Sequence, residues 1–202
     1  MVESISSTSP RALTGMTLGS AVMFVFGIFW FLAGFSGGRF FPAWMRVGVP
    51  LLGVVLAIWL AVMAVRVARI SRNAPPPSAE QAALGRQIGR RFGRIHAIQW
   101  GSIVAAIAVL NIVHLPNFIA PAVAVIVALH FFPLAALFQR PSYNVTGILG
   151  CAIGLGGALI SSPSARLSAV GLSFGLLLWL TVADALVGIS RAARAQREEN
   201  RP

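Results

Sequence analysis

Asp184 and His130 are the residues at which the chemistry of this chain should begin, because each lies inside a long apolar stretch. A carboxylate near the bilayer centre costs about 2.5 to 3.5 kcal/mol on insertion scales, and such residues usually mark a pathway, a proton relay or a partner. Asp184 precedes Arg191 by seven residues, and His130 precedes Arg140 by ten. At 1.5 Å per helical residue, they would lie about 10 and 15 Å from the same end of a helix bundle. They would form an ion pair or a hydrogen-bonded pair if their helices touch.

Pro133 predicts a break in the helix that carries His130. Proline has no backbone N–H, so the carbonyl of Leu129 loses its helical donor and the helix should kink beside the histidine. Broken helices at membrane depth are often where binding sites are built. The alternative is structural: Asp184 would snorkel or cap a neighbouring helix, and His130 would be a packed, neutral histidine.

One short motif resembles a known group of proteins. The stretch His130-Phe-Phe-Pro-Leu-Ala135, followed by Tyr143 and Gly147, is similar to a His-Phe-x-Pro motif of small polytopic bacterial membrane proteins of unassigned function. The resemblance covers only two apolar segments. It implies a fold of this kind and no activity.

Other motifs for catalysis or metal binding are missing from the sequence. Asn111 and His114 lie one helical turn apart, but no His-x-x-x-His or acidic cluster completes a metal site, and His96 is expected at the cytoplasmic surface. The single cysteine, Cys151, allows neither a disulfide framework nor a Cys-rich site. There is no Gly-x-Ser-x-Gly elbow, no phosphate-binding loop with a lysine and no pair of acids. We therefore expect no metal, no cofactor, and neither hydrolysis nor ATP use.

A second candidate site is a four-residue period in residues 85–95, where Gly-Arg pairs recur. The period aligns glycines in one row, arginines in the next, and an apolar stripe beside them. A basic amphipathic helix of this kind lies at a membrane surface with its stripe in the headgroup boundary. It is either a topology anchor or a cradle for anionic lipid or phosphate, worth about 1 kcal/mol per arginine. The candidates for the cradle are Arg86, Arg90, Arg91 and Arg94. The glycine row favours close approach of another backbone.

Composition indicates the class of protein that must position these residues. With 57% hydrophobic and 10% charged residues, the chain lacks the polar surface of a soluble fold of 202 residues. The net charge of +11 would suggest nucleic acid on a soluble domain. Here the arginines flank apolar stretches and have no aromatic stacking platform, so anionic lipid headgroups are the expected partner and nucleic acid is not.

The predicted fold is an all-α, polytopic transmembrane helix bundle forming a single integral membrane domain over residues 1–202. A span needs about 20 apolar residues, and six stretches qualify, at about 13–35, 45–67, 95–113, 117–138, 145–161 and 167–189. Residues 69–94 form a cytoplasmic segment: a proline-rich spacer at 73–77, then the basic helix. A capping box formed by Ser78 and Gln81 should start that helix at Ala79, from which it runs on into the third span.

Arginine placement predicts the orientation. Eleven of the sixteen basic residues fall in Arg66–Arg94 and Arg191–Arg201. Arginine accumulates on the cytoplasmic side of a membrane. The sequence therefore predicts a multi-pass protein of the cell's inner membrane with both termini in the cytoplasm.

Glycines predict how the helices pack, because membrane helices associate through small residues. One row should make the fifth span the most enclosed helix, and a shorter row lies on the sixth: Gly147, Gly150, Gly154 and Gly157, then Gly171 and Gly175. The same rows would equally serve a homo-oligomer.

Three functions fit these patterns. The first is a small transporter or channel with its polar centre at His130 and Asp184. The second is a non-catalytic scaffold or accessory subunit that packs through its glycine faces. The third, ranked behind both, is a membrane-embedded lipid-modifying enzyme with His130 as acid/base and the arginines holding a headgroup.

Overall fold

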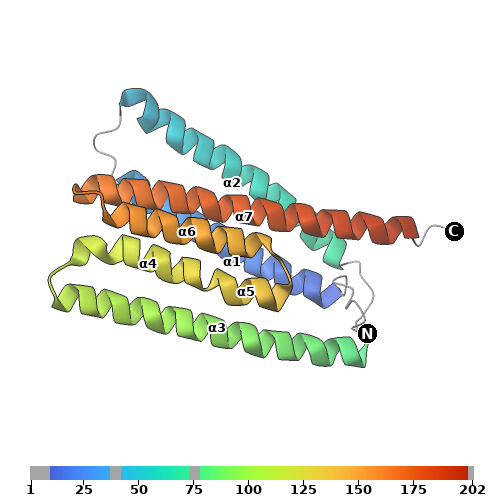
Figure 1. Ribbon diagram of the computed structural model, residues 1–202. Helices are drawn as coiled ribbons and strands as arrows, with labels where there is room; N and C mark the ends of the chain where they lie inside the picture. Colours follow the sequence, from blue (N-terminus) through green and yellow to red (C-terminus); the bar gives the residue numbers. More distant parts are fainter. Residues whose placement is uncertain (1–9, 37–41, 73–77, 200–202) are drawn as a thin grey trace.

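The computed structural model describes residues 10–36, 42–72 and 78–199, and within these ranges the chain is helical and contains no strand. The predicted all-α class is therefore confirmed. Seven α-helices and one short 3-10 helix follow one another (Figure 1): α1 (Pro10–Ser36), α2 (Ala43–Arg72), α3 (Ala79–Ile112), η1 (Pro116–Phe118), α4 (Ile119–Leu129), α5 (Phe131–Phe138), α6 (Ser142–Ala158) and α7 (Pro163–Glu199). The predicted spacer at 73–77 lies outside the described residues.

Three stretches of the described chain are long and apolar enough to cross a membrane: Ala82–Ile112, Pro116–Phe138 and Pro163–Gly188. Val22–Ser36 is apolar but shorter. The remaining predicted spans fall on α1, α2 and α6. With 17 residues, α6 measures about 26 Å, somewhat less than the roughly 30 Å of a hydrocarbon core.

The helices form a bundle in which successive rods run in opposite directions, with α4 and α5 together forming one rod (Figure 1). α1 packs along α7, and α6 lies against both α4 and α7. α3 packs on α4 and α5, while α2 contacts α1 and α7. The start of α1 and the end of α7 lie at the same end of the bundle as the turn between α5 and α6 (Figure 1).

The contact between α1 and α7 is closest where glycines face each other. A Cβ atom added to Gly171 would lie 2.5 Å from the Cα of Gly34, and one on Gly175 would lie 3.0 Å from the carbonyl oxygen of Gly27. No side chain fits in such a space. Gly171 and Gly175 therefore allow the two backbones to touch, as small residues do in membrane helix pairs.

Four of the glycines of α6 are buried against α4 and α7. A Cβ on Gly150 would lie 2.8 Å from the Ala128 Cβ, and one on Gly154 would lie 2.9 Å from the Pro121 carbonyl oxygen. Gly147 and Gly157 are buried in the same way, the former against Phe132 and the latter against Val170. The most enclosed helix is nevertheless α7 and not α6, which keeps an exposed apolar face.

α3 is one continuous helix of 34 residues, about 51 Å long. It begins at Ala79, as the capping residues indicate, and the carbonyl of Ser78 accepts the N–H of Ala82 at 2.9 Å. Its apolar stripe differs from expectation, because Phe92 and Ile95 pack against the bundle core and do not turn toward lipid. The predicted close approach at the glycine row is also wrong where it can be assessed, since no described atom lies within 4 Å of a Cβ at Gly89 or Gly93.

At the other end of the bundle, Arg166 joins two turns. Its guanidinium is buried and donates to the carbonyl of Ile160, at 3.0 Å from Nε and 2.7 Å from Nη2, and to that of Asn117, at 3.2 Å. It also lies 4.0 Å over the ring centroid of Phe118. Because a planar fork can serve two carbonyls at once, one side chain links η1 to the start of α7.

Candidate functional site

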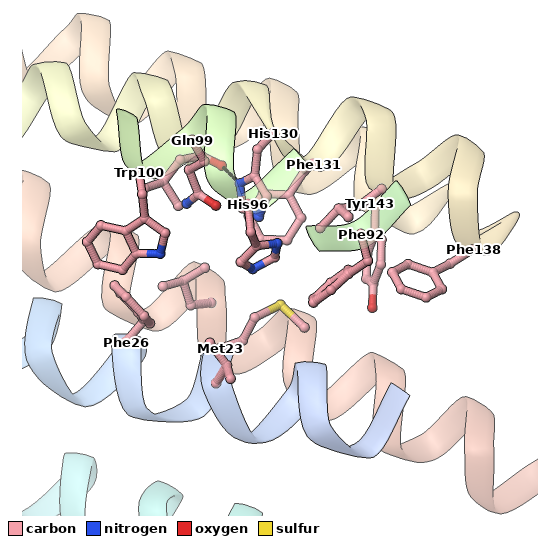
Figure 2. Close-up of a pocket in the computed structure, with 14 residues that line it drawn as sticks. Met23, Phe26, Phe92, His96, Gln99, Trp100, His130, Phe131, Phe138 and Tyr143 are labelled. Atoms are coloured by element: carbon pink, nitrogen blue, oxygen red, sulfur yellow. Dashed lines mark hydrogen bonds between the residues drawn. The ribbon is translucent and has the colours of Figure 1, made fainter. Parts of the chain in front are cut away.

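A cavity of about 70 Å³ lies inside the bundle, between α1, α3, the α4–α5 pair, α6 and α7 (Figure 2). Its wall is mainly aromatic and aliphatic. Five lining residues carry nitrogen or oxygen groups in their side chains: His96, Gln99, Trp100, His130 and Tyr143. None of the described lining residues carries a fixed formal charge.

His130 enters the cavity from the break between α4 and α5. The structure has this break three residues before Pro133, where α4 ends at Leu129 and α5 begins at Phe131. The ring Nδ1 is hydrogen-bonded to the carbonyl oxygen of Val127, one turn earlier. A carbonyl can only accept, so Nδ1 is the donor and Nε2 carries the lone pair of the neutral ring.

His96 faces His130 from α3. The two ring centroids are 5.7 Å apart and the ring planes stand at 83°. The ring of Phe92 lies 4.2 Å from that of His96. The Nδ1 atom of His96 is buried and has no hydrogen-bond partner among the described residues.

Gln99 is 8% exposed and lies one turn beyond His96 on the same helix. Its Oε1 atom has no hydrogen-bond partner in the described part of the chain. Figure 2 shows the amide beside the two imidazoles at the cavity. A buried acceptor left unpaired costs about 1 to 3 kcal/mol, so this arrangement favours a cavity that receives a hydrogen-bonding solute.

The structure does not bring Asp184 to His130. The Asp184 side chain is 53% exposed on α7, and its carboxylate lies 3.9 Å from Nη2 of Arg140. Gly188 makes room for that guanidinium, because it has no side chain at the point where Arg140 passes α7. Counting residues along a helix gives depth but not the direction in which a side chain points, and here the two residues face different neighbours.

The arginine row lies apart from the cavity. The side chains of Arg86, Arg90, Arg91 and Arg94 are all exposed, and none lines the cavity. Phe92 and His96, on another face of the same helix, are the residues of this stretch that reach it. Any ligand of the arginines would therefore bind outside the cavity.

His96, Gln99 and Met23 are among the cavity residues that were not expected from the sequence. For the residues on α3, the spacing of Phe92, His96, Gln99 and Ile103 indicates a position on one helical face. That face is recognisable only once α3 is known to be a single helix packed on α4 and α5. The neighbouring arginines instead suggested a surface position for His96.

His114, by contrast, has a structural role. It adopts a left-handed backbone conformation with φ of 58° just beyond the end of α3, where the N–H of Leu115 bonds to the carbonyl of Leu110 at 2.8 Å. This is the hydrogen-bond pattern of a Schellman cap. His114 is thus not one turn from Asn111 on a helical face. Within the described ranges, no group of three or more His, Cys, Asp or Glu residues is arranged to hold a metal ion.

Comparison with protein families, curated proteins and solved structures finds no match to this chain.

Proposed function

We propose that this chain is a multi-pass membrane protein that binds a small solute at the His96–His130 cavity, as a transporter or channel does. The observation that carries the proposal is the unpartnered, buried Gln99 beside two histidines. They meet among helices that include three stretches apolar enough to span a membrane. Ionisable groups in such surroundings are usually kept for a pathway or a ligand. The centre of the site is His96 with His130, in place of His130 with Asp184.

The proposed topology has six spans in an inner membrane with both termini in the cytoplasm. The clustered arginines support this orientation. The arrangement of the ends supports it too, because α1 starts and α7 ends on the side of the turn that holds Arg140 (Figure 1). The exposed arginines of α3 would then meet anionic lipid headgroups at the cytoplasmic surface.

Cavity size limits the solute. An engineered apolar cavity of about 150 Å³ binds benzene, and this one is about 70 Å³. A few water molecules or a small ion fit, whereas a typical metabolite does not. The lack of arginine among the described lining residues disfavours an anion, which leaves a small cation or a small neutral hydrogen-bond donor.

Two observations favour this function over the alternatives. The predicted glycine rows of α6 and α7 are occupied by contacts within the chain, so these rows do not form the free faces that a scaffold would use. The exposed arginines do not line the cavity that holds His130, which disfavours a mechanism in which they hold a lipid headgroup against that histidine.

The test is a thermal-shift screen of the purified protein in detergent against small cations, small neutral solutes and pH. A solute that binds the cavity should stabilise the wild type and Asp184→Asn but not His96→Gln or His130→Gln. The same solute should cross proteoliposome membranes at a rate that both histidine variants reduce. A solute whose stabilisation is lost in Asp184→Asn and retained in both histidine variants would overturn the proposal.

A further inference from the structure

We infer that the His96–His130 pair, with Met23, is a binding site for a soft monovalent metal ion of the Cu⁺ class. The inference rests on the proposed function only for the cavity, and it names the class of solute. It starts from three residues that line the cavity: Met23 on α1, His96 on α3 and His130 at the α4–α5 break.

The separation of the two rings suits a shared ion. Metal–imidazole nitrogen bonds are about 2 Å long, so two rings bound to one ion have centroids about 5 to 6 Å apart, depending on the angle at the metal. The observed separation between His96 and His130 is 5.7 Å. The centroid separation therefore already lies in the range expected for two imidazoles on one ion.

The hydrogen bond of His130 prepares its ring as a ligand. Metal-binding histidines almost always donate their other ring N–H to a carbonyl, a carboxylate or water, which fixes the tautomer. His130 makes this bond to Val127 through Nδ1. Its Nε2 lone pair is thereby left for the cavity, where no hydrogen-bond donor from the described residues occupies it.

The third ligand decides the metal class. Met23 borders the same cavity (Figure 2), and thioether sulfur selects soft ions such as Cu⁺. Structural Zn²⁺ sites are almost always closed by four ligands, and hard cations such as Mg²⁺ prefer carboxylate and carbonyl oxygen. The described lining contains neither carboxylate nor cysteine, so it lacks ligands that these divalent ions prefer.

The wall of the cavity also suits one positive charge better than two. Its ligands are neutral, so a bound Cu⁺ ion leaves a net charge of one inside the bundle. The rings of Phe26, Phe92 and Trp100 line the same space, and aromatic faces attract cations. A divalent ion without an acidic ligand would leave twice that charge in apolar surroundings, where isolated charge is costly.

The experiment uses the full chain in detergent with Cys151→Ser as the background, because the thiol would itself bind soft metals. Two metal ions are added in separate experiments. One is Ag⁺, a redox-stable analogue of Cu⁺, and the other is Cu⁺ kept reduced with ascorbate. Bound metal is counted by mass spectrometry after desalting, and Cu⁺ affinity is measured against a coloured chelator. We expect one ion per chain.

The variants distinguish the loss of a metal ligand from the loss of the folded structure. His96→Gln and His130→Gln should each weaken Cu⁺ binding by about 100-fold or more, because losing even an outer-shell partner costs 10- to 100-fold. Met23→Leu, which preserves side-chain volume, should weaken Cu⁺ more than Zn²⁺. His114→Gln, at the end of α3, should bind like the background. Thermal unfolding of each variant without metal shows whether it is folded.

Equal Ag⁺ binding in the background and in both folded histidine variants would overturn the site. Binding of Zn²⁺ in preference to Ag⁺ would overturn the metal class. The proposed function fails differently: if the metal binds with the expected dependence on His96 and His130 but never crosses proteoliposome membranes, the metal site stands and transport does not. If another solute crosses with that dependence and no soft metal binds, transport stands and the metal site does not.

Discussion

At the scale of single residues, Gln99 shows a local conflict between folding and binding. A buried amide oxygen without a partner lowers stability, yet it lies where a ligand would meet both histidines. Sites that violate the rule of satisfied polar groups tend to be functional sites. The stability of the empty protein and its response to solute should therefore change in opposite directions when this residue is replaced.

Gln99→Leu tests that expectation. The change removes an unpaired acceptor and keeps a side chain of similar size, so the protein without solute should become more stable by about 1 to 3 kcal/mol. Stabilisation by the cavity's solute should shrink at the same time. Unfolding in detergent with and without solute measures both effects. A variant that is less stable without solute would contradict this account of Gln99.

Arg166 should be the most sensitive arginine in the described chain for stability. In Arg166→Ala, the carbonyls of Ile160 and Asn117 lose their donor, which should cost about 2 to 5 kcal/mol. Arg166→Lys keeps the charge without the planar fork, so its loss should be intermediate. Unfolding midpoints in detergent check the order, with the exposed Arg90 changed to alanine as the control. Equal midpoints for Arg166→Ala and Arg90→Ala would show that the hydrogen bonds of Arg166 do not stabilise the fold.

The sequence identified His130 correctly as a residue at a helix break, because proline chemistry is local and can be recognised without a fold. It assigned the wrong partner, since Asp184 and His130 share a depth but not a direction. His96 was placed at the surface because its neighbours are arginines. Its actual position depends on how α3 packs against α4, which no local pattern contains.

At the scale of helices, the chain relies on backbone contact where α1 crosses α7. The approximate positions of the helices were predictable from apolar length, and the start of α3 from its capping residues, but α2 and α7 extend beyond the predicted spans to Arg72 and Glu199. The pairing was only partly predictable: the row at Gly171 and Gly175 marked a contact face, but nothing in the sequence identified Gly34 and Gly27 as its partners. The row on α3 had the same spacing, yet Gly89 and Gly93 make no such contact with described residues.

Gly171→Ala and Gly101→Ala form a matched pair that tests this distinction. The first places a methyl group 2.5 Å from the Gly34 Cα, and because the obstacle is backbone, the two helices must separate at a cost of about 1 to 3 kcal/mol. The second has no described atom within 4 Å and should gain up to about 1 kcal/mol of helix propensity. Unfolding in detergent should move in opposite directions for the two. The packing scheme is wrong if Gly171→Ala is as stable as the wild type.

At the scale of the whole molecule, the ends of the helices predict which segments share a side of the membrane. A fluorescent reporter fused after the last residue should be bright in the cytoplasm, and alkaline phosphatase there should be inactive. Phosphatase inserted at 113–115, between α3 and η1, should be active. Insertion at 139–141, between α5 and α6, should again be inactive. Activity on both sides of the α4–α5 pair would exclude a crossing by that pair.

One consequence of the length of α3 concerns motion. The arginines of its first half and His96 belong to one uninterrupted helix, so they rotate together as one rigid body. Any rotation that re-aims His96 in the cavity must turn Arg86, Arg90 and Arg94 through the same angle. In the proposed topology, whatever contacts those guanidinium groups at the surface would therefore also restrict the orientation of His96 in the cavity.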